Sequence, residues 1–77
     1  MTASQGWEAR LSGMSTYHLV QYATLTSHFV SEVRSRWAAG QPVAAHCTSQ
    51  WIDRLDAQAA MAERVIARRI DNLDPPA

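Results

Sequence analysis

The sequence predicts an all-α protein: an antiparallel helical hairpin of two long helices with a short N-terminal helix. Two observations carry this prediction: apolar residues recur at helical spacing over two long segments, and glycine and proline separate those segments. The 77 residues are 47% apolar, which suits a single domain over 1–77 near the size at which one core becomes marginal. A second copy would supply further apolar contacts, so we expect a homodimer in which two hairpins form a four-helix bundle.

The short helix is expected over about residues 3–12. Thr2 and Gln5 have the spacing of a capping box, and a glycine follows the segment. Trp7 and Leu11 lie one turn apart and share a face. Because a helix of this length is unstable alone, we expect Trp7 and Leu11 to dock it against the rest of the molecule.

The first long helix is expected over about residues 16–39. Ser15 is the expected N-cap, and Gly40 has the position of the glycine that commonly follows a C-cap. At 100° per residue, the apolar side chains gather on one face, which we expect to be buried. This face consists of Leu19, Tyr22, Ala23, Thr26, Phe29, Val30, Val33 and Trp37.

The second long helix is expected over about residues 49–73, with Thr48 or Ser49 as its cap and the run Asp74-Pro75-Pro76 as its end. Its apolar residues follow a heptad pattern, which is typical of a helix packed along another helix. The seam consists of Ile52, Leu55, Ala59, Ala62, Ile66 and Leu73; Arg69 breaks the pattern, and Ile70 replaces it.

Folding the chain back about residues 40–48 predicts which side chains face one another. Phe29 would lie opposite Ala59, so that a large side chain meets a small one at the middle of the hairpin. Leu19 would lie opposite Ile70 at the open end. The remaining expected pairs are Trp37 with Ile52, Val33 with Leu55, Thr26 with Ala62, and Tyr22 with Ile66.

A hairpin of two helices leaves the flanks of its apolar faces open. Aromatic and methionine side chains are enriched at protein interfaces, so open flanks of this composition favour binding to another chain. We therefore expect a non-enzymatic protein-binding module, an inhibitor or regulatory adaptor that occupies a surface of a larger protein. The expected partner-binding residues are Tyr17, Val20, Leu25, Trp51, Met61 and Val65.

Charge argues against nucleic acid as the main partner. Seven basic and seven acidic residues cancel, so the chain has no net positive field that would attract phosphates. The alternative is a dimeric nucleic-acid-binding regulator that uses Arg54, Arg64 and Arg68 of the second long helix, although acidic residues share that helix.

Metal binding and catalysis are not expected. His28 and Glu32 have the i, i+4 spacing of two metal ligands, His18 lies ten residues before His28, and His46 is adjacent to Cys47. Neither set reaches the three or four ligands that a zinc site requires. No nucleophile motif or glycine-rich phosphate loop occurs, so we expect neither a cofactor nor an enzyme.

We expect the protein to be cytoplasmic. The single cysteine, Cys47, has no partner for an internal disulfide, and the first residues lack the basic and apolar regions of a secretory signal. Polar residues such as Gln21 and Thr24 interrupt the most apolar stretch, so no membrane span is expected.

Overall fold

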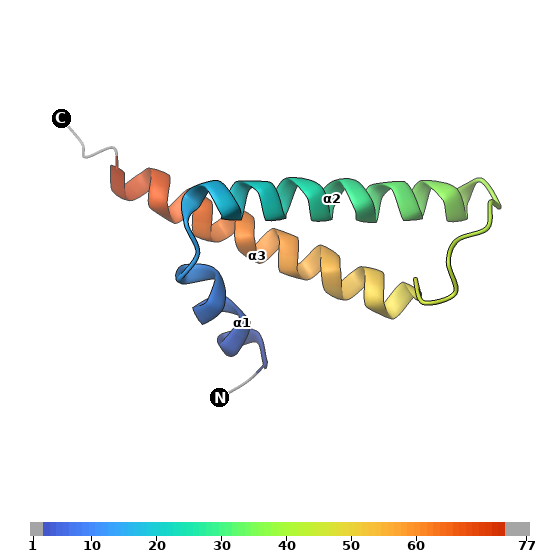
Figure 1. Cartoon of the computed structure of the whole chain (residues 1–77), viewed down its shortest axis with the longest axis horizontal. Coiled ribbons are helices and arrows are strands. Elements are labelled where there is room, and N and C mark those ends of the chain that lie inside the picture. The colour runs from blue at the N-terminus through green and yellow to red at the C-terminus, as the bar shows by residue number, and fades with distance from the viewer. Residues whose placement is uncertain (1–2, 74–77) are drawn as a thin grey trace.

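The computed structural model describes residues 3–73, and side chains over residues 6–72. This part of the chain is all helical, with three helices and no strand: α1 (Ala3–Ser12), α2 (Thr16–Ala38) and α3 (Ser49–Leu73) (Figure 1). Each helix begins and ends within one residue of its expected bounds. The expected capping box of Thr2 and Gln5 and the stop at Asp74-Pro75-Pro76 lie outside the described residues.

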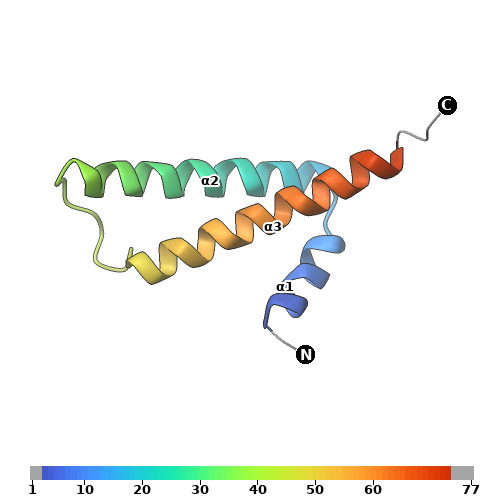
Figure 2. The ribbon, with the colours of Figure 1, turned by 180° about the vertical axis from the view of Figure 1, so that it is seen from behind.

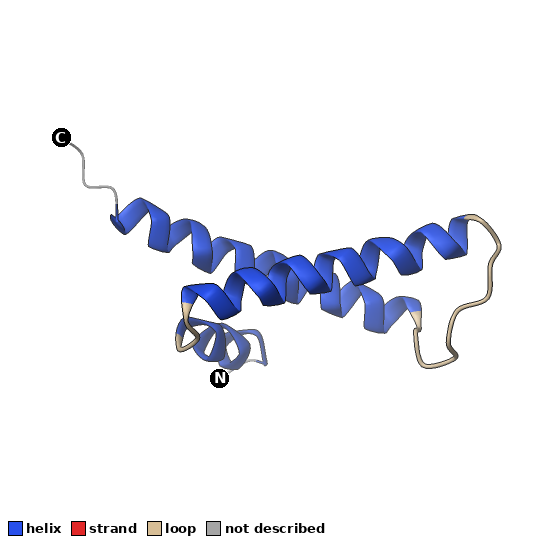
Figure 3. Cartoon of the chain, turned by 45° about the horizontal axis from the view of Figure 1, so that its top comes forward, coloured by secondary structure: helices blue, strands red, loops and turns tan. Residues whose placement is uncertain are grey.

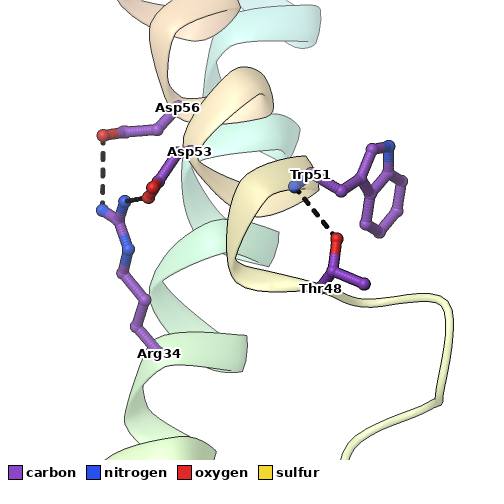
Figure 4. A network of polar contacts seen from close by, with 5 residues as sticks. All are labelled: Arg34, Thr48, Trp51, Asp53 and Asp56. Atoms are coloured by element: carbon purple, nitrogen blue, oxygen red, sulfur yellow. Dashed lines mark hydrogen bonds and ion pairs between the residues drawn. The ribbon is translucent and has the colours of Figure 1, made fainter.

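Hydroxyl caps begin both long helices. The Ser15 hydroxyl accepts a hydrogen bond from the backbone N–H of His18 at 3.2 Å, and the Thr48 hydroxyl accepts one from the backbone N–H of Trp51 at 3.2 Å (Figure 4). Each cap satisfies one of the backbone donors that have no partner within the first turn of a helix. Of the two expected caps of α3, Thr48 is therefore the one used.

A glycine ends α2, as expected. Gly40 has φ +71°, a left-handed conformation that side chains with a Cβ adopt at a cost. Its N–H donates to the carbonyl of Trp37 at 3.1 Å, and the N–H of Gln41 donates to the carbonyl of Arg36 at 2.9 Å. This pair of bonds is the Schellman motif, which turns the chain out of the helix.

The two long helices form an antiparallel hairpin, joined by residues 39–48. They cross at an angle instead of lying side by side along their whole length (Figures 1 and 3). The last turns of α3 extend past the start of α2 in both ribbon views (Figures 1 and 2). The Cα radius of gyration is 15.0 Å, compared with about 11.5 Å for a compact domain of this length. The molecule is therefore elongated.

The core is divided into two clusters, one at each end of the hairpin. Where the hairpin is open, α1 contributes to the cluster of Leu11, Leu19, Ala23, Ala62 and Val65. Beside the connecting segment, the cluster consists of Val30, Val33, Cys47 and Ile52.

The crossing of the helices corrects the expected pairing at the middle of the hairpin. Phe29 was expected against Ala59 in the core, but its side chain is 36% exposed, and the neighbouring Val30 is buried in its place. The small side chains of Ala23, Ala59 and Ala62 are buried instead, and the Phe29 ring packs edge to face against Trp51 on the flank. Trp37, also expected to be buried, is exposed for the related reason that the helices diverge toward the connecting segment.

The pairing expected at the open end is also wrong. Leu19 is fully buried, but it packs with Ala62 and Val65 and not with Ile70, whose side chain is 58% exposed. The reason is the overhang of α3: its last turns lie beyond the start of α2, so a residue there has no helix opposite it.

The short helix α1 is docked, as expected, and it packs chiefly on α3. Leu11 is fully buried, and Trp7 packs against the same cluster. Arg69 of α3 holds the chain where α1 joins α2, because its guanidinium donates to the carbonyls of Ser12 at 3.0 Å and Met14 at 2.6 Å.

Candidate functional site

An uncovered apolar strip on one flank of the hairpin is the candidate functional site. Phe29 of α2 and Trp51 of α3 meet edge to face, with their ring centroids 5.9 Å apart. Leu25 lies one turn before Phe29 on the same side of α2, and its side chain is 67% exposed. Trp51 is half-buried and contributes the edge of the surface next to the core. We call Leu25, Phe29 and Trp51 the open strip.

The connecting segment and α1 set the two ends of the open strip. At one end, the His46 ring packs against Trp51 with a centroid separation of 5.4 Å. At the other end, Tyr22 donates its hydroxyl hydrogen to Oε1 of Gln58, 3.4 Å away. The Trp7 ring of α1 packs against Tyr22 at 5.9 Å, and burial raises the pKa of the Tyr22 phenol. Thus α1 covers the Tyr22 end of this flank and leaves the strip open.

Two residues expected on an open flank lie beside α1 instead. Val65 is 5% exposed and shares a core cluster with Leu11, while Met61 is half-buried against the same cluster. The expectation that Val65 lies on an open surface is therefore wrong, because α1 covers that part of α3. The seam pattern of α3 alone does not indicate where a third helix docks.

Tyr17 and Val20 are exposed, but they do not join the open strip. The Tyr17 hydroxyl accepts a hydrogen bond from the Gln21 side chain at 2.9 Å, on a solvent-facing side of α2. At 100° per residue, Val20 lies about 140° around α2 from Leu25. The six expected partner-binding residues therefore do not form one surface.

The opposite flank of the hairpin carries an ion-pair network (Figure 4). Arg34 of α2 donates to Asp53 at 2.9 Å and to Asp56 at 3.3 Å, both on α3. The hydrogen bond to Asp53 raises the pKa of the Arg34 guanidinium. This network joins the two long helices across a polar flank, whereas the flank with the open strip is apolar.

The three arginines of the expected nucleic-acid surface differ in their surroundings. Arg68 donates to the Glu8 carboxylate of α1 at 2.7 Å, and this hydrogen bond lowers the pKa of Glu8. Arg54 and Arg64 are exposed, and within the described part of the chain neither has an acidic group within 4.0 Å. One of the three charges is therefore already neutralised.

The candidate metal ligands remain dispersed. His28 and Glu32 lie 3.8 Å apart on an exposed side of α2. Cys47 is buried and contributes to the core beside the connecting segment, away from His18 near the start of α2. Over residues 3–73, no three histidine, cysteine or acidic side chains lie close enough together to hold a metal ion.

The sequence reasoning missed two residues that organise this region. Phe29, at the centre of the open strip, was assigned to the core because the helical pattern does not report how close the two backbones come. Arg69 was treated as a break in the seam of α3. An arginine at a seam position is itself a signal, since a buried guanidinium requires acceptors nearby.

None of the described helices has both the length and the apolar character that crossing a bilayer requires. No protein-family model, curated protein or solved structure matches this chain. Its function must therefore be inferred from its own residues.

Proposed function

We propose that this chain is a protein-binding module, an inhibitor or regulatory adaptor that occupies a surface of a larger protein through its open strip. The observation that carries the proposal is the apolar surface that Leu25 and Phe29 expose beside the half-buried ring of Trp51. Aromatic side chains with an exposed apolar face are the type that contributes most to protein association.

The distribution of apolar side chains supports the same proposal. Among the residues described, the large side chains that are fully buried are Leu11, Leu19 and Ile52. Twice as many large apolar or aromatic side chains are exposed, and most of these belong to α2. Single exposed apolar residues need no explanation, but contiguous ones mark interaction surfaces. Among the exposed residues of α2, Leu25 and Phe29 are neighbours on one side, and a partner that covers them removes apolar surface from water, which is the main favourable term in association.

The shape of the open strip favours a helix as the contacting element. Leu25 and Phe29 follow the axis of α2 at i, i+4 spacing, and Trp51 contributes from the adjacent helix. A partner helix presents matching apolar residues at the same spacing, so its side chains fit between those of α2 and α3. We propose that the larger protein contributes such an amphipathic helix.

The proposal is tested by affinity capture from the native host with charge variants of the strip. We expect Phe29→Asp to lose a stoichiometric partner that the unmodified chain retains. Thr24→Asp is the matched control, because Thr24 is exposed on the same helix, next to the strip residue Leu25 in sequence but about 100° around the helix from it. Loss of the partner from both variants, or from neither, would contradict the assignment of the strip.

We further propose that two copies associate through this surface into an antiparallel four-helix bundle. Bundles of this kind pack helices at shallow angles around apolar residues that recur at helical spacing. Sedimentation velocity at micromolar concentration tests this step, with a dimer expected for the unmodified chain and a monomer for Phe29→Asp. A single monomer boundary for the unmodified chain would reject the homodimer and leave the larger protein as the partner.

Nucleic acid is the weaker alternative. On its proposed surface of Arg54, Arg64 and Arg68, the charge of Arg68 is already paired with Glu8. A salt-sensitive affinity for duplex DNA, lost in Arg64→Gln, would reverse this ranking.

A further inference from the structure

A hollow between α1 and α3 adjoins the Tyr22 end of the flank that carries the open strip. It has a volume of about 550 Å³, and its lining consists of Gly6, Trp7, Arg10, Arg54 and Gln58. Clefts of this volume hold small organic ligands, although this one is shallow and open to solvent. The two arginines come from different helices, so the hollow exists only because α1 docks on α3.

The charged side chains that line this hollow are all positive. Arg10 and Arg54 line it, and no acidic residue does. Within the described residues, neither arginine has a carboxylate within 4.0 Å. The acidic side chain of α1, Glu8, is already bound by Arg68. In a chain whose seven basic and seven acidic residues cancel, two uncompensated guanidiniums beside one hollow form a local positive site that attracts an anion.

The Trp7 indole adds an apolar wall and an unused donor. Its Nε1 is buried and has no hydrogen-bond partner, and it is the one such side-chain atom among those described. A buried polar group without a partner is destabilising, and such groups in native proteins call for an explanation. This nitrogen is closed to solvent, so an acceptor atom of a ligand in the hollow reaches it only if the indole ring turns.

Gly6 provides the fourth observation. It lies inside α1, where glycine is unfavourable. Its backbone conformation is open to other residues as well, because the positive φ among the described glycines belongs to Gly40. A Cβ added at Gly6 would have no neighbour within 4 Å, so close packing does not require glycine either. Because Gly6 has no side chain, the hollow is open at this position.

We propose that this hollow binds an organic anion, with an oxyanion head between Arg10 and Arg54 and an apolar body against the Trp7 indole. Carboxylates and phosphates share the required head-group chemistry, because a guanidinium donates paired hydrogen bonds to either. The site does not depend on the open strip, and it does not require a protein partner.

The proposal is tested by titrating the ¹⁵N-labelled full chain at constant ionic strength with phenylacetate, phenyl phosphate and phenylacetamide. The readout is the resonance of the Trp7 indole N–H, identified by its absence in Trp7→Phe. We expect a saturable shift with at least one of the two anions and none with the neutral amide. The comparison of the two anions identifies whether the head group is a carboxylate or a phosphate.

Variants assign the binding to the two arginines. We expect Arg10→Gln and Arg54→Gln each to raise the dissociation constant about tenfold, which is the loss typical of a hydrogen bond to a charged group. Arg64→Gln is the matched control and should leave the constant unchanged. Gly6→Ala should weaken binding, because its methyl group projects into the open space.

Three outcomes would overturn the proposal. The first is the absence of saturation by about 10 mM anion, an affinity too weak for a specific site. The second is an equal shift with phenylacetamide, which would show that charge plays no part. The third is an equal loss of binding in Arg64→Gln and Arg54→Gln, which would show attraction to the positive charge of α3 as a whole.

Discussion

At the scale of single residues, Gly6 and Gly40 differ in whether the backbone conformation requires glycine. Gly40 has a left-handed backbone conformation that ends α2, whereas Gly6 lies in the middle of α1 with no such requirement. We expect Gly6→Ala to raise the free energy of unfolding by about 0.5–1 kcal/mol, because alanine loses less backbone entropy in a helix. Gly40→Ala is the comparison and should lower it by about 1 kcal/mol. Urea denaturation measures both, and a destabilising Gly6→Ala would show that the glycine has a structural role.

Glu8 gives the molecule a dependence on pH. The hydrogen bond from Arg68 lowers the pKa of the Glu8 carboxyl, so the charged form is favoured in the folded state. The stability from this pair is therefore present above the pKa of the unfolded chain and is lost as pH falls through the lower folded value. We expect the urea midpoint to fall between about pH 5 and pH 3.

Glu8→Gln isolates that effect. The glutamine does not titrate, so the variant should lose less stability over the same pH range than the unmodified chain. Parallel pH profiles for the two proteins would show that the Glu8–Arg68 pair adds nothing to stability in solution, as is common for exposed ion pairs.

At the scale of elements, the attachment of α1 decides which flank of the hairpin is covered. Leu11 supplies the buried contact, and Arg69 binds the chain on either side of the turn between α1 and α2. The side chain of Arg69 also donates to the Thr16 hydroxyl at 2.9 Å. One guanidinium thus connects three elements.

We expect Arg69→Met to lower the free energy of unfolding by about 2 kcal/mol, since methionine keeps an apolar stem and loses the charged hydrogen bonds. It should also increase hydrogen exchange of the α1 amides more than those of α2. Arg64→Met is the matched control; Arg64 is exposed, so its loss should change stability by no more than about 0.5 kcal/mol. Equal effects of the two substitutions would remove the special role of Arg69.

The elements themselves could be predicted from the sequence, because their signals are local. Ser15, Thr48 and Gly40 act within one turn of the chain, so their positions in sequence indicate where the helices begin and end. The pairing of α2 with α3 depends on the crossing angle, which no local signal reports. Phe29 was therefore assigned to the core, although it lies on the surface.

The candidate site could be predicted only in part, for the same reason. Leu25 was expected on an open flank and is exposed, whereas Trp51, expected there too, is half-buried against the core beside the connecting segment. Val65 was expected there too, but a short helix with little apolar asymmetry carries no information on where it docks. The position of α1 thus determines which expected residues remain available for a partner.

At the scale of the whole molecule, the hairpin leaves part of its apolar surface exposed to solvent. α2 has its main contact with α3 alone, since α1 packs chiefly on α3. Much of the apolar surface of α2 therefore remains in water, in a chain with few fully buried large side chains. For a chain of this size the margin of stability is small. We propose that another protein chain covers the open strip.

Photo-crosslinking in the native host tests this claim most directly. A benzophenone amino acid is placed at Leu25 in the strip or, as the control, at Thr24, which is exposed on another side of the same helix. We expect irradiation to give one covalent adduct of defined mass from position 25, formed with a second copy or with a larger protein, and no such adduct from position 24. An absence of adduct at position 25, or the same adducts from both positions, would contradict the claim.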